Sequence, residues 1–354
     1  MTIALAHGLD QTLSAVRRAR RGALRRQVRV VMILTALLML AFAMALSLGD
    51  FPVAPAALLT ALVSPLTGIA TPGTDFIVLQ LRLPRAVLAL LSGAAFGLSG
   101  YLFQSLLRNP LASPDIIGIS RGASAAAVCA IVILGWSGGN LAIAALSGAL
   151  LTAAAIYLLA WRDNLSPYRV VLVGIGVESV LIAIIAYLFT TARIFEVQQA
   201  LGWMVGSLNG ARWTEVGIMA ATLVVLVPAA LALQRGLGAL ALGDDAAIAL
   251  GTRLEPVRLG IIVVAVALSG LATACVGPVA FIAFVAGPIA IRLLGSGNAL
   301  IPAMLVGALV MLGGDLAAQH AIPGLQLPVG VVTGLFGAIF LLGLLAGANR
   351  RGTA

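Results

Sequence analysis

The chain of 354 residues is too apolar to fold as a protein dissolved in water. Hydrophobic residues make up 61% of it and charged residues 9%, whereas soluble domains carry about 25% charged residues. This composition excludes a soluble enzyme, a disordered protein and a fibrous repeat. The formal net charge of +9 comes from arginines that flank apolar segments, so it indicates membrane topology rather than nucleic-acid binding.

The apolar residues fall into long runs, and these predict an all-α, polytopic membrane protein with ten transmembrane helices. A helix needs about 20 apolar residues to cross a bilayer. The strands of a β-barrel would instead alternate apolar and polar residues, and these runs do not. The predicted spans are Val30–Leu48, Arg85–Leu106, Ile117–Leu134, Leu141–Trp161, Val170–Thr190, Glu215–Leu233, Arg258–Cys275, Val279–Leu294, Ala299–His320 and Pro328–Leu345.

The arginines predict the orientation of these spans. With the N-terminus inside, 17 arginines fall in cytoplasmic segments and 4 in outer segments. Because basic residues favour the cytoplasmic side, we expect both termini to be inside. The expected organisation is a basic cytoplasmic extension (1–29), a ten-helix transmembrane domain (30–347) and a cytoplasmic tail (348–354).

A secretory signal is the alternative interpretation of the N-terminus. Ala43, Met44 and Ala45 look like a cleavage site after a basic and an apolar stretch. The basic stretch is long, however, and the apolar run is longer than a typical signal core. A cytoplasmic extension that fixes the first helix is therefore favoured.

Residue types that carry covalent or metal chemistry are scarce. All 21 basic residues are arginine, and a P-loop needs a lysine on the nucleotide phosphates. His7 and His320 are far apart, and Cys129 and Cys275 lie in apolar runs, so neither a disulfide framework nor a zinc pattern is present. We expect no catalytic residue, no metal site and no bound cofactor in this chain.

Two cytoplasmic connectors carry distinctive residues. Arg108, Asn109 and Pro110 begin the loop after the second span, where an Asx residue and prolines predict a rigid turn. In the longest inner loop, Gly243 precedes two acids and predicts the start of a short helix that ends near Gly251.

This short helix has an expected apolar side that includes Ala247 and Leu250. A lone short helix is marginal in water. We therefore expect it to dock either on a protein partner or on the bilayer surface, and the residues alone do not choose between the two.

Four charged residues lie at unusual places. Glu178 and Asp315 fall within predicted spans, where acids are costly and face a pathway or a hydrogen-bonding partner. Arg82 and Arg85 lie outside, just before the second span. They are expected to bind lipid headgroups, to pair with Asp75, or to meet an acidic partner protein.

A series of short motifs follows in a fixed order along the chain. They are Arg82-Leu83-Pro84-Arg85, Gly93, Gly100 and Gln104, Arg108-Asn109-Pro110-Leu111-Ala112, Gly118-Ile119-Ser120 with Gly122-Ala123, Trp203 with Gly206-Ser207-Leu208, Leu242-Gly243 through Leu250-Gly251, Gly277-Pro278-Val279-Ala280-Phe281, Arg292, and Leu327-Pro328-Val329-Gly330. In this order they resemble one family, the FecCD-type permease subunit of iron-siderophore and vitamin B12 ABC importers, and the resemblance covers about residues 28–345.

The resemblance implies a transport subunit that works as a pair in the bacterial cytoplasmic membrane. Two separate ATPase subunits would use the ATP, and an extracytoplasmic binding protein would deliver the ligand. Arg82 and Arg85 would dock that binding protein, and the pathway would run along the fifth and tenth spans. The ATPase-coupling residues implied are Gly243, Asp244, Asp245, Ala246, Ala247, Leu250 and Gly251, and the pathway candidates are Gln104, Glu178, Gln326 and Pro328.

The chain also departs from the family pattern. Gly287-Pro288-Ile289 stands where the family often has Pro-His, Gln326 replaces a usual Glu, and Gln319 replaces a common basic residue. These changes favour a ferric siderophore over vitamin B12 as cargo, and a heterodimer with a second permease over a homodimer. The alternative function is an ion- or proton-coupled secondary transporter that uses Glu178 or Asp315. An intramembrane enzyme is disfavoured because no Ser/His or His/Glu pair has catalytic spacing.

Overall fold

The computed structural model describes residues 2–49, 51–68, 71–115, 117–161, 167–295, 298–322 and 324–349, and this part of the chain is almost entirely helical. Its elements are α1 (Thr2–Ser47), α2 (Pro55–Thr67), α3 (Pro72–Asp75), the π-helix η1 (Phe76–Arg82), α4 (Leu83–Leu107), α5 (Ile119–Leu134), α6 (Gly139–Ala160), α7 (Pro167–Thr191), α8 (Ile194–Met204), α9 (Trp213–Ala241), α10 (Asp244–Ala249), α11 (Leu254–Val276), α12 (Ile282–Leu294), α13 (Leu300–His320) and α14 (Val329–Asn349).

Seven of the described helices are long and apolar enough to cross a membrane, which confirms an all-α, multi-pass protein. They lie in α1, in the continuous segment 73–107, and in α6, α7, α9, α11 and α13. Three further predicted spans correspond to α5, α12 and the apolar part of α14, which are shorter. The α12 helix has 13 residues because the five residues before it are not helical and end in Phe281 at φ 69°.

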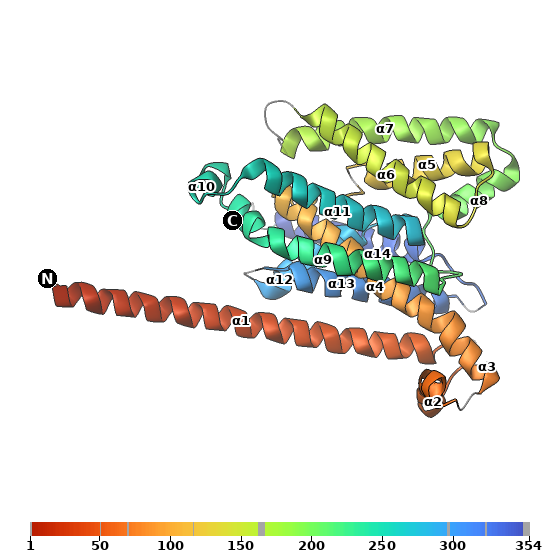
Figure 1. Cartoon of the computed structure of the whole chain (residues 1–354), viewed down its shortest axis with the longest axis horizontal. Helices are drawn as coiled ribbons and strands as arrows, with labels where there is room; N and C mark the ends of the chain where they lie inside the picture. Colours follow the sequence, from red (N-terminus) through yellow and green to blue (C-terminus); the bar gives the residue numbers. More distant parts are fainter. Residues whose placement is uncertain are drawn as a thin grey trace.

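The helix α4 is the centre of the bundle. It packs against α9, α11, α12 and α13, and most of its side chains are buried. Figure 1 shows it crossing the molecule between the helices that surround it. A transmembrane helix enclosed on all sides by protein is apolar around its circumference, so α4 gives no amphipathic signal of its place in the sequence.

Close backbone approach fixes α4 against α13. A Cβ atom added at Gly97 would lie 2.3 Å from the carbonyl oxygen of Ala303, and one added at Gly307 would lie 2.8 Å from the Gly97 Cα. Small residues let membrane helices approach this closely and gain van der Waals contact. The glycines of α4 are therefore packing residues that hold the core of the bundle together.

The first helix differs from the sequence expectation. From residue 2 onward, the predicted extension (1–29) continues into the first span as one helix, α1, of 46 residues, which ends at Ser47. It packs along α13 and α12, and its N-terminal end projects beyond the bundle (Figure 1). Its apolar part, Arg20–Ser47, is long enough to cross a membrane.

Several short helices lie near the two ends of the bundle (Figure 1). Figure 1 places α10 and the beginning of α1 at one end, and α2, α3 and the start of α9 at the other. The short helix α10 was predicted by Gly243 followed by Asp244, and the structure confirms it: Gly243 is its N-cap at φ 109°. The helices α2 and α8 were not expected from the sequence.

Candidate functional site

The short helix α10 is held to the bundle by a charged cluster around Asp244, the coupling clamp. Arg258 of α11 donates to Asp244 Oδ2 at 2.7 Å, and Arg108 donates to Oδ1 at 2.9 Å. Arg258 also reaches Glu255 at 3.4 Å. The clamp thus joins the end of α4 to two consecutive elements that lie far from it in the sequence, the start of α10 and α11.

The electrostatics of the clamp favour an ionised Asp244. The hydrogen bond from Arg258 is the main cause that lowers the pKa of Asp244, and partial burial opposes it. The side chain of Arg258 is 7% exposed, whereas that of Asp244 is 47% exposed. Because a buried cation needs a partner, Asp244 stabilises Arg258 as much as it positions α10. Asp245 is exposed and no ion pair joins it to another described residue.

The turn after α4 presents Arg108 to the clamp. Arg108 adopts φ 49°, the left-handed conformation that ends the helix. The side-chain oxygen of Asn109 accepts a hydrogen bond from the backbone N–H of Leu111 at 2.9 Å. This contact closes an Asx turn around Pro110. The turn predicted at Arg108, Asn109 and Pro110 is therefore present as a local structure, and its place on the cytoplasmic side stays a prediction.

The apolar side of α10 is divided between the interior and the surface, which corrects the sequence expectation. Ala247 is fully buried, so it packs within the chain and cannot contact a partner. Ile248 and Leu250 are 60% and 65% exposed, as is Leu242 just before the helix at 67%. Gly251 follows the C-cap Leu250 at φ 77°. An outward apolar surface of Leu242, Ile248 and Leu250 remains.

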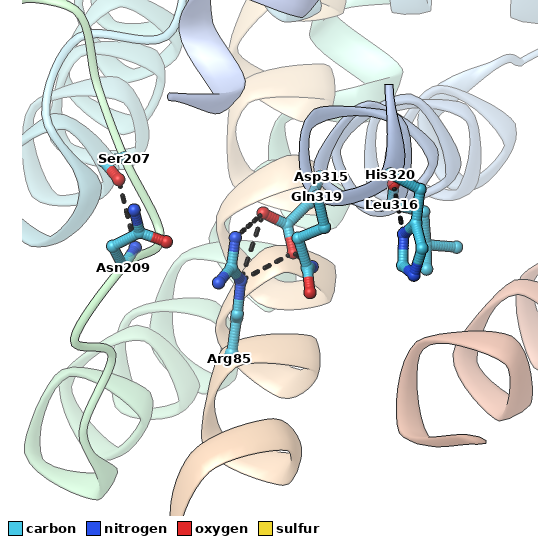
Figure 2. A network of polar contacts seen from close by, with 7 residues as sticks. All are labelled: Arg85, Ser207, Asn209, Asp315, Leu316, Gln319 and His320. Carbon is cyan, nitrogen blue, oxygen red and sulfur yellow. Dashed lines mark hydrogen bonds and ion pairs between the residues drawn. The ribbon is translucent and has the colours of Figure 1, made fainter. Parts of the chain in front are cut away.

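The two arginines predicted to lie outside, Arg82 and Arg85, bind partners within the chain. Arg85 of α4 forms a paired ion bridge to Asp315 of α13 at 2.8 and 2.9 Å, and Gln319 donates to the same carboxylate (Figure 2). The Asp315 side chain is 2% exposed and that of Arg85 is 16% exposed. The ion pair that the sequence suggested with Asp75 is instead made with Asp315.

Arg82 has a similar structural position. It donates to the carbonyl oxygens of Leu46 at 2.8 Å and Phe51 at 2.5 Å. Both arginines line a hollow of about 230 Å³ together with Gln319, His320 and Gln326. The exposed arginines near this end include Arg193 and Arg212, whose backbone groups cap α8 and α9.

A second hollow, of about 390 Å³, lies between the start of α5 and α7, α12 and α14; we call it the serine cavity. One wall is polar and the other is apolar and aromatic. Its lining residues are Ser113, Asp115, Ser120, Arg121, Ser124, Glu178, Met204, Pro278, Val279, Ala280, Phe281, Phe284 and Leu341. A larger hollow of about 650 Å³ lies among α6, α9 and α11, away from α7 and α14.

The predicted pathway residues are dispersed. Glu178 lines the serine cavity and pairs with Arg121 of α5 at 3.3 Å, so it is both an interhelix contact and a lining residue. Gln104 is buried and donates to the Phe284 carbonyl oxygen at 2.9 Å, which ties α4 to α12 rather than lining a cavity. Gln326 lies at the outer hollow, and Pro328 accepts a backbone bond at the start of α14.

Residues to which the sequence assigned no role complete these sites. Asp115 and Ser120 line the serine cavity, and Arg258 binds Asp244. A signal was present for Asp115, an acid in an apolar connector after two prolines. Among the described residues, no group of three or more His, Cys, Asp or Glu side chains is arranged to hold a metal ion.

Comparison with known proteins places these features in a family. The model of the FecCD transport family matches residues 37–347. The chain is 42% identical over 287 residues to the ferric enterobactin transport system permease FepG of Escherichia coli, covering 81% of this chain and 87% of that protein. It is 38% identical over 335 residues to the achromobactin transport permease CbrC of Dickeya dadantii, covering 92% and 95% of the two chains.

The fold is also found in a solved structure. A metal-chelate type ABC transporter in an inward-facing conformation matches with a TM-score of 0.79 at 24% identity, over 90% of this chain and 99% of that one. This likeness shows the fold alone. Because the family model spans nearly the whole transmembrane region and the relatives are matched over most of their length, the chain belongs to the FecCD transport family.

Proposed function

We propose that this chain is the permease subunit of an ATP-driven importer that carries a ferric siderophore across the bacterial cytoplasmic membrane. The observation that carries the proposal is the family match over residues 37–347, joined to curated relatives named as permeases for ferric enterobactin and achromobactin. The relatives also include a vitamin B12 permease at 36% identity. The departures at Gln319 and Gln326 favour the siderophore.

The proposed topology has ten spans with both termini in the cytoplasm. The seven long helices would provide seven spans, and α5, α12 and the apolar part of α14, Val329–Gly343, which are shorter, would provide the other three. Short helices can contribute to a span where protein surrounds their ends, because backbone groups at those ends then find partners inside the bundle. The arginine distribution supports the orientation.

The proposed coupling site is the outward face of α10. Leu242, Ile248 and Leu250 would fill a groove of the ATPase subunit, since exposed apolar side chains grouped at one end of a membrane protein suit a protein partner. The coupling clamp at Asp244 would transmit movement of α10 to α4 and α11. Gly243 at φ 109° lets the chain turn into the helix.

The proposed partners are a second permease, two ATPase subunits and an extracytoplasmic siderophore-binding protein. The departures from the family pattern favour a heterodimer. Docking of the binding protein would take place on the rim that carries Arg82 and Arg85. Arg82 and Arg85 bind partners within this end of the bundle, yet both side chains stay partly exposed. The exposed Arg193 and Arg212 would add positive charge to the same surface.

A secondary transporter is not favoured. Both Glu178 and Asp315 are paired with arginines. Each acid thereby joins two helices, which accounts for its place in the membrane without a role in ion coupling.

Copurification with an ATPase subunit tests the proposed function. The permease should copurify with its ATPase, and Ile248→Glu/Leu250→Glu should abolish copurification because two charges enter an apolar contact. Ile194→Glu/Phe195→Glu serves as a matched control, since these residues are 77% and 72% exposed at the start of α8, outside the candidate membrane helices and outside the proposed groove. Equal ATPase recovery with the α10 variant would refute the coupling site. Uptake of a panel of radio-iron chelates by a deletion strain then identifies the cargo.

A further inference from the structure

The serine cavity contains a carboxylate that is incompletely satisfied. Ser120 donates a hydrogen bond to Asp115 Oδ1. The other oxygen, Oδ2, is shielded from solvent and has no hydrogen-bond partner among the described residues, although the residue as a whole is part-exposed. A buried acceptor without a partner is costly, so a missing donor is the simplest completion of this site.

The charges around the cavity define what that donor can be. The charged groups that face Asp115 are Arg121 on α5 and Glu178 on α7. Arg121 is already paired with Glu178 at 3.3 Å. The polar wall therefore keeps one excess negative charge, and it suits a cation or a neutral N–H or O–H donor better than an anion.

The opposite wall defines the rest of the ligand. Phe281 and Phe284 form an edge-to-face pair with ring centroids 5.9 Å apart. With Val279 and Leu341 they present an apolar surface to the cavity. Ligand pockets of this kind bind an apolar body and use a few polar groups to fix its orientation.

On this geometry we propose that the serine cavity is a transit subsite for the organic scaffold of the chelate, in which an ammonium or amide N–H group of the scaffold binds Asp115. The inference rests on the proposed function as a ferric-chelate permease. The oxygens that bind Fe³⁺ in a chelate are anionic acceptors, so the wall of Asp115 and Glu178 repels them. The iron core is thus oriented away from α5.

The cavity is also connected to the coupling clamp. Asp115 follows Arg108 by seven residues in the connector between α4 and α5. Arg108 binds Asp244 of α10. Movement of α10 is therefore delivered through one short, proline-containing segment to the residue that holds the scaffold.

A thiol-protection assay tests the subsite in the assembled permease–ATPase complex. Cys129 and Cys275 are replaced by alanine, and Ala280→Cys is introduced, because Ala280 is exposed and lines the cavity. The rate of maleimide labelling at pH 8 is measured with three ferric tris-hydroxamate probes. They share one iron core and end in a primary ammonium, a secondary amide or a tertiary amide.

The ammonium and secondary-amide probes should protect the thiol at concentrations about tenfold lower than the tertiary amide, as expected for one hydrogen bond to a charged group. In the isosteric Asp115→Asn variant this difference should shrink to about twofold. Asp75→Asn, outside the cavity, should keep the tenfold ranking.

Equal protection by all three probes, or an unchanged ranking in Asp115→Asn, would overturn the proposal. Protection by sodium or potassium chloride alone would overturn it too, because the site would then hold an inorganic cation. The two hypotheses fail separately: if radio-iron uptake shows that the parent carries no ferric chelate, the proposed function fails, whereas normal uptake with an unchanged ranking refutes the subsite alone.

Discussion

At the residue scale, individual charges of this membrane protein are paired between different helices. Arg85 with Asp315, Arg258 with Asp244 and Arg121 with Glu178 each join two helices. In a low-dielectric surrounding, an ion pair is far less costly than either ion alone. Substitutions that remove one partner should therefore act differently from substitutions that remove both.

Arg85 and Asp315 provide a direct test of this difference. Arg85→Gln alone leaves a carboxylate that is 2% exposed beside one Gln319 donor, and should lower the stability by about 3 kcal/mol. Arg85→Gln/Asp315→Asn should recover most of this loss. The measurement is thermal unfolding of the purified protein in detergent.

The same pair separates a structural role from docking. If the charge of Arg85 is used by the binding protein, the double variant should be stable yet capture less of it, most clearly at low salt. Wild-type capture and salt dependence in the double variant would limit Arg85 to holding α4 against α13.

Asp115 predicts a pH dependence of stability. Burial raises its pKa from 3.8 to about 6, so the folded state binds more protons than the unfolded state between these values. Stability should therefore fall as the pH rises from about 4 to 6, by up to about 3 kcal/mol, and stay lower at neutral pH. Unfolding midpoints at pH 5 and pH 7.5 measure this. Asp115→Asn should reduce the difference, and an identical pH profile in that variant would rule out Asp115 as its source.

Asp244 predicts uncoupling. Asp244→Asn keeps the size of the side chain but removes the charge that pairs with the buried Arg258. We expect transport per ATP hydrolysed to fall by about fivefold, with a stability loss of about 1–2 kcal/mol because Asp244 is half exposed. Asp245→Asn removes the same charge without breaking an ion pair and should have a smaller effect on both. Uptake and ATP hydrolysis are measured in parallel in proteoliposomes. Equal values for the two variants would contradict a coupling role for the Asp244–Arg258 pair.

At the scale of the element, the sequence predicts structures that are formed by residues close together in the chain, and does not predict contacts between helices. The short helix α10 and the Asx turn were predicted because glycine, acid and asparagine positions act within a few residues. The burial of Ala247 could not be predicted because it depends on how α10 folds back onto its neighbours α9 and α11. The partner of Arg85 could not be predicted because α13 is distant from α4 in the sequence. The length of α1 was missed as well: its basic residues suggested an extension, yet arginine is a good helix former.

The packing of α4 on α13 is the element contact most sensitive to side-chain size. Gly97→Ala places a Cβ atom 2.3 Å from a backbone carbonyl oxygen, so the helices must separate. A loss of about 2–4 kcal/mol is expected, similar to overpacking combined with lost neighbouring contacts. Gly217→Ala on α9 is the matched control because no atom lies within 4 Å of its added Cβ. Equal unfolding midpoints for the two variants would contradict the role of α4 as the central helix.

At the scale of the whole molecule, composition alone predicted a polytopic helical membrane protein, and the structure confirms that class. Composition could not decide the number of crossings, because α5 and α12 have 16 and 13 residues. It could not locate the serine cavity either, since the cavity is built from five separate segments. The family resemblance, by contrast, was visible in short motifs in sequence order.

The topology makes a prediction for the whole chain. Ten crossings with an inside N-terminus place the end of the chain in the cytoplasm. Fusions after Gly352 should be active with a cytoplasmic reporter and silent with a periplasmic one. The opposite pattern would show that the number of crossings is odd. The 13-residue α12 would then be the first helix to be excluded as a span.

The continuous helix α1 has a geometric consequence beyond transport. Eighteen residues, 2–19, precede its apolar part, Arg20–Ser47. At 1.5 Å per residue they form a rod about 27 Å long. A fluorophore or a small rigid domain fused in helical register to Thr2 would be carried at a fixed height above the membrane surface. Energy transfer between this fluorophore and a second one on another helix would then report movements of the transporter relative to α1.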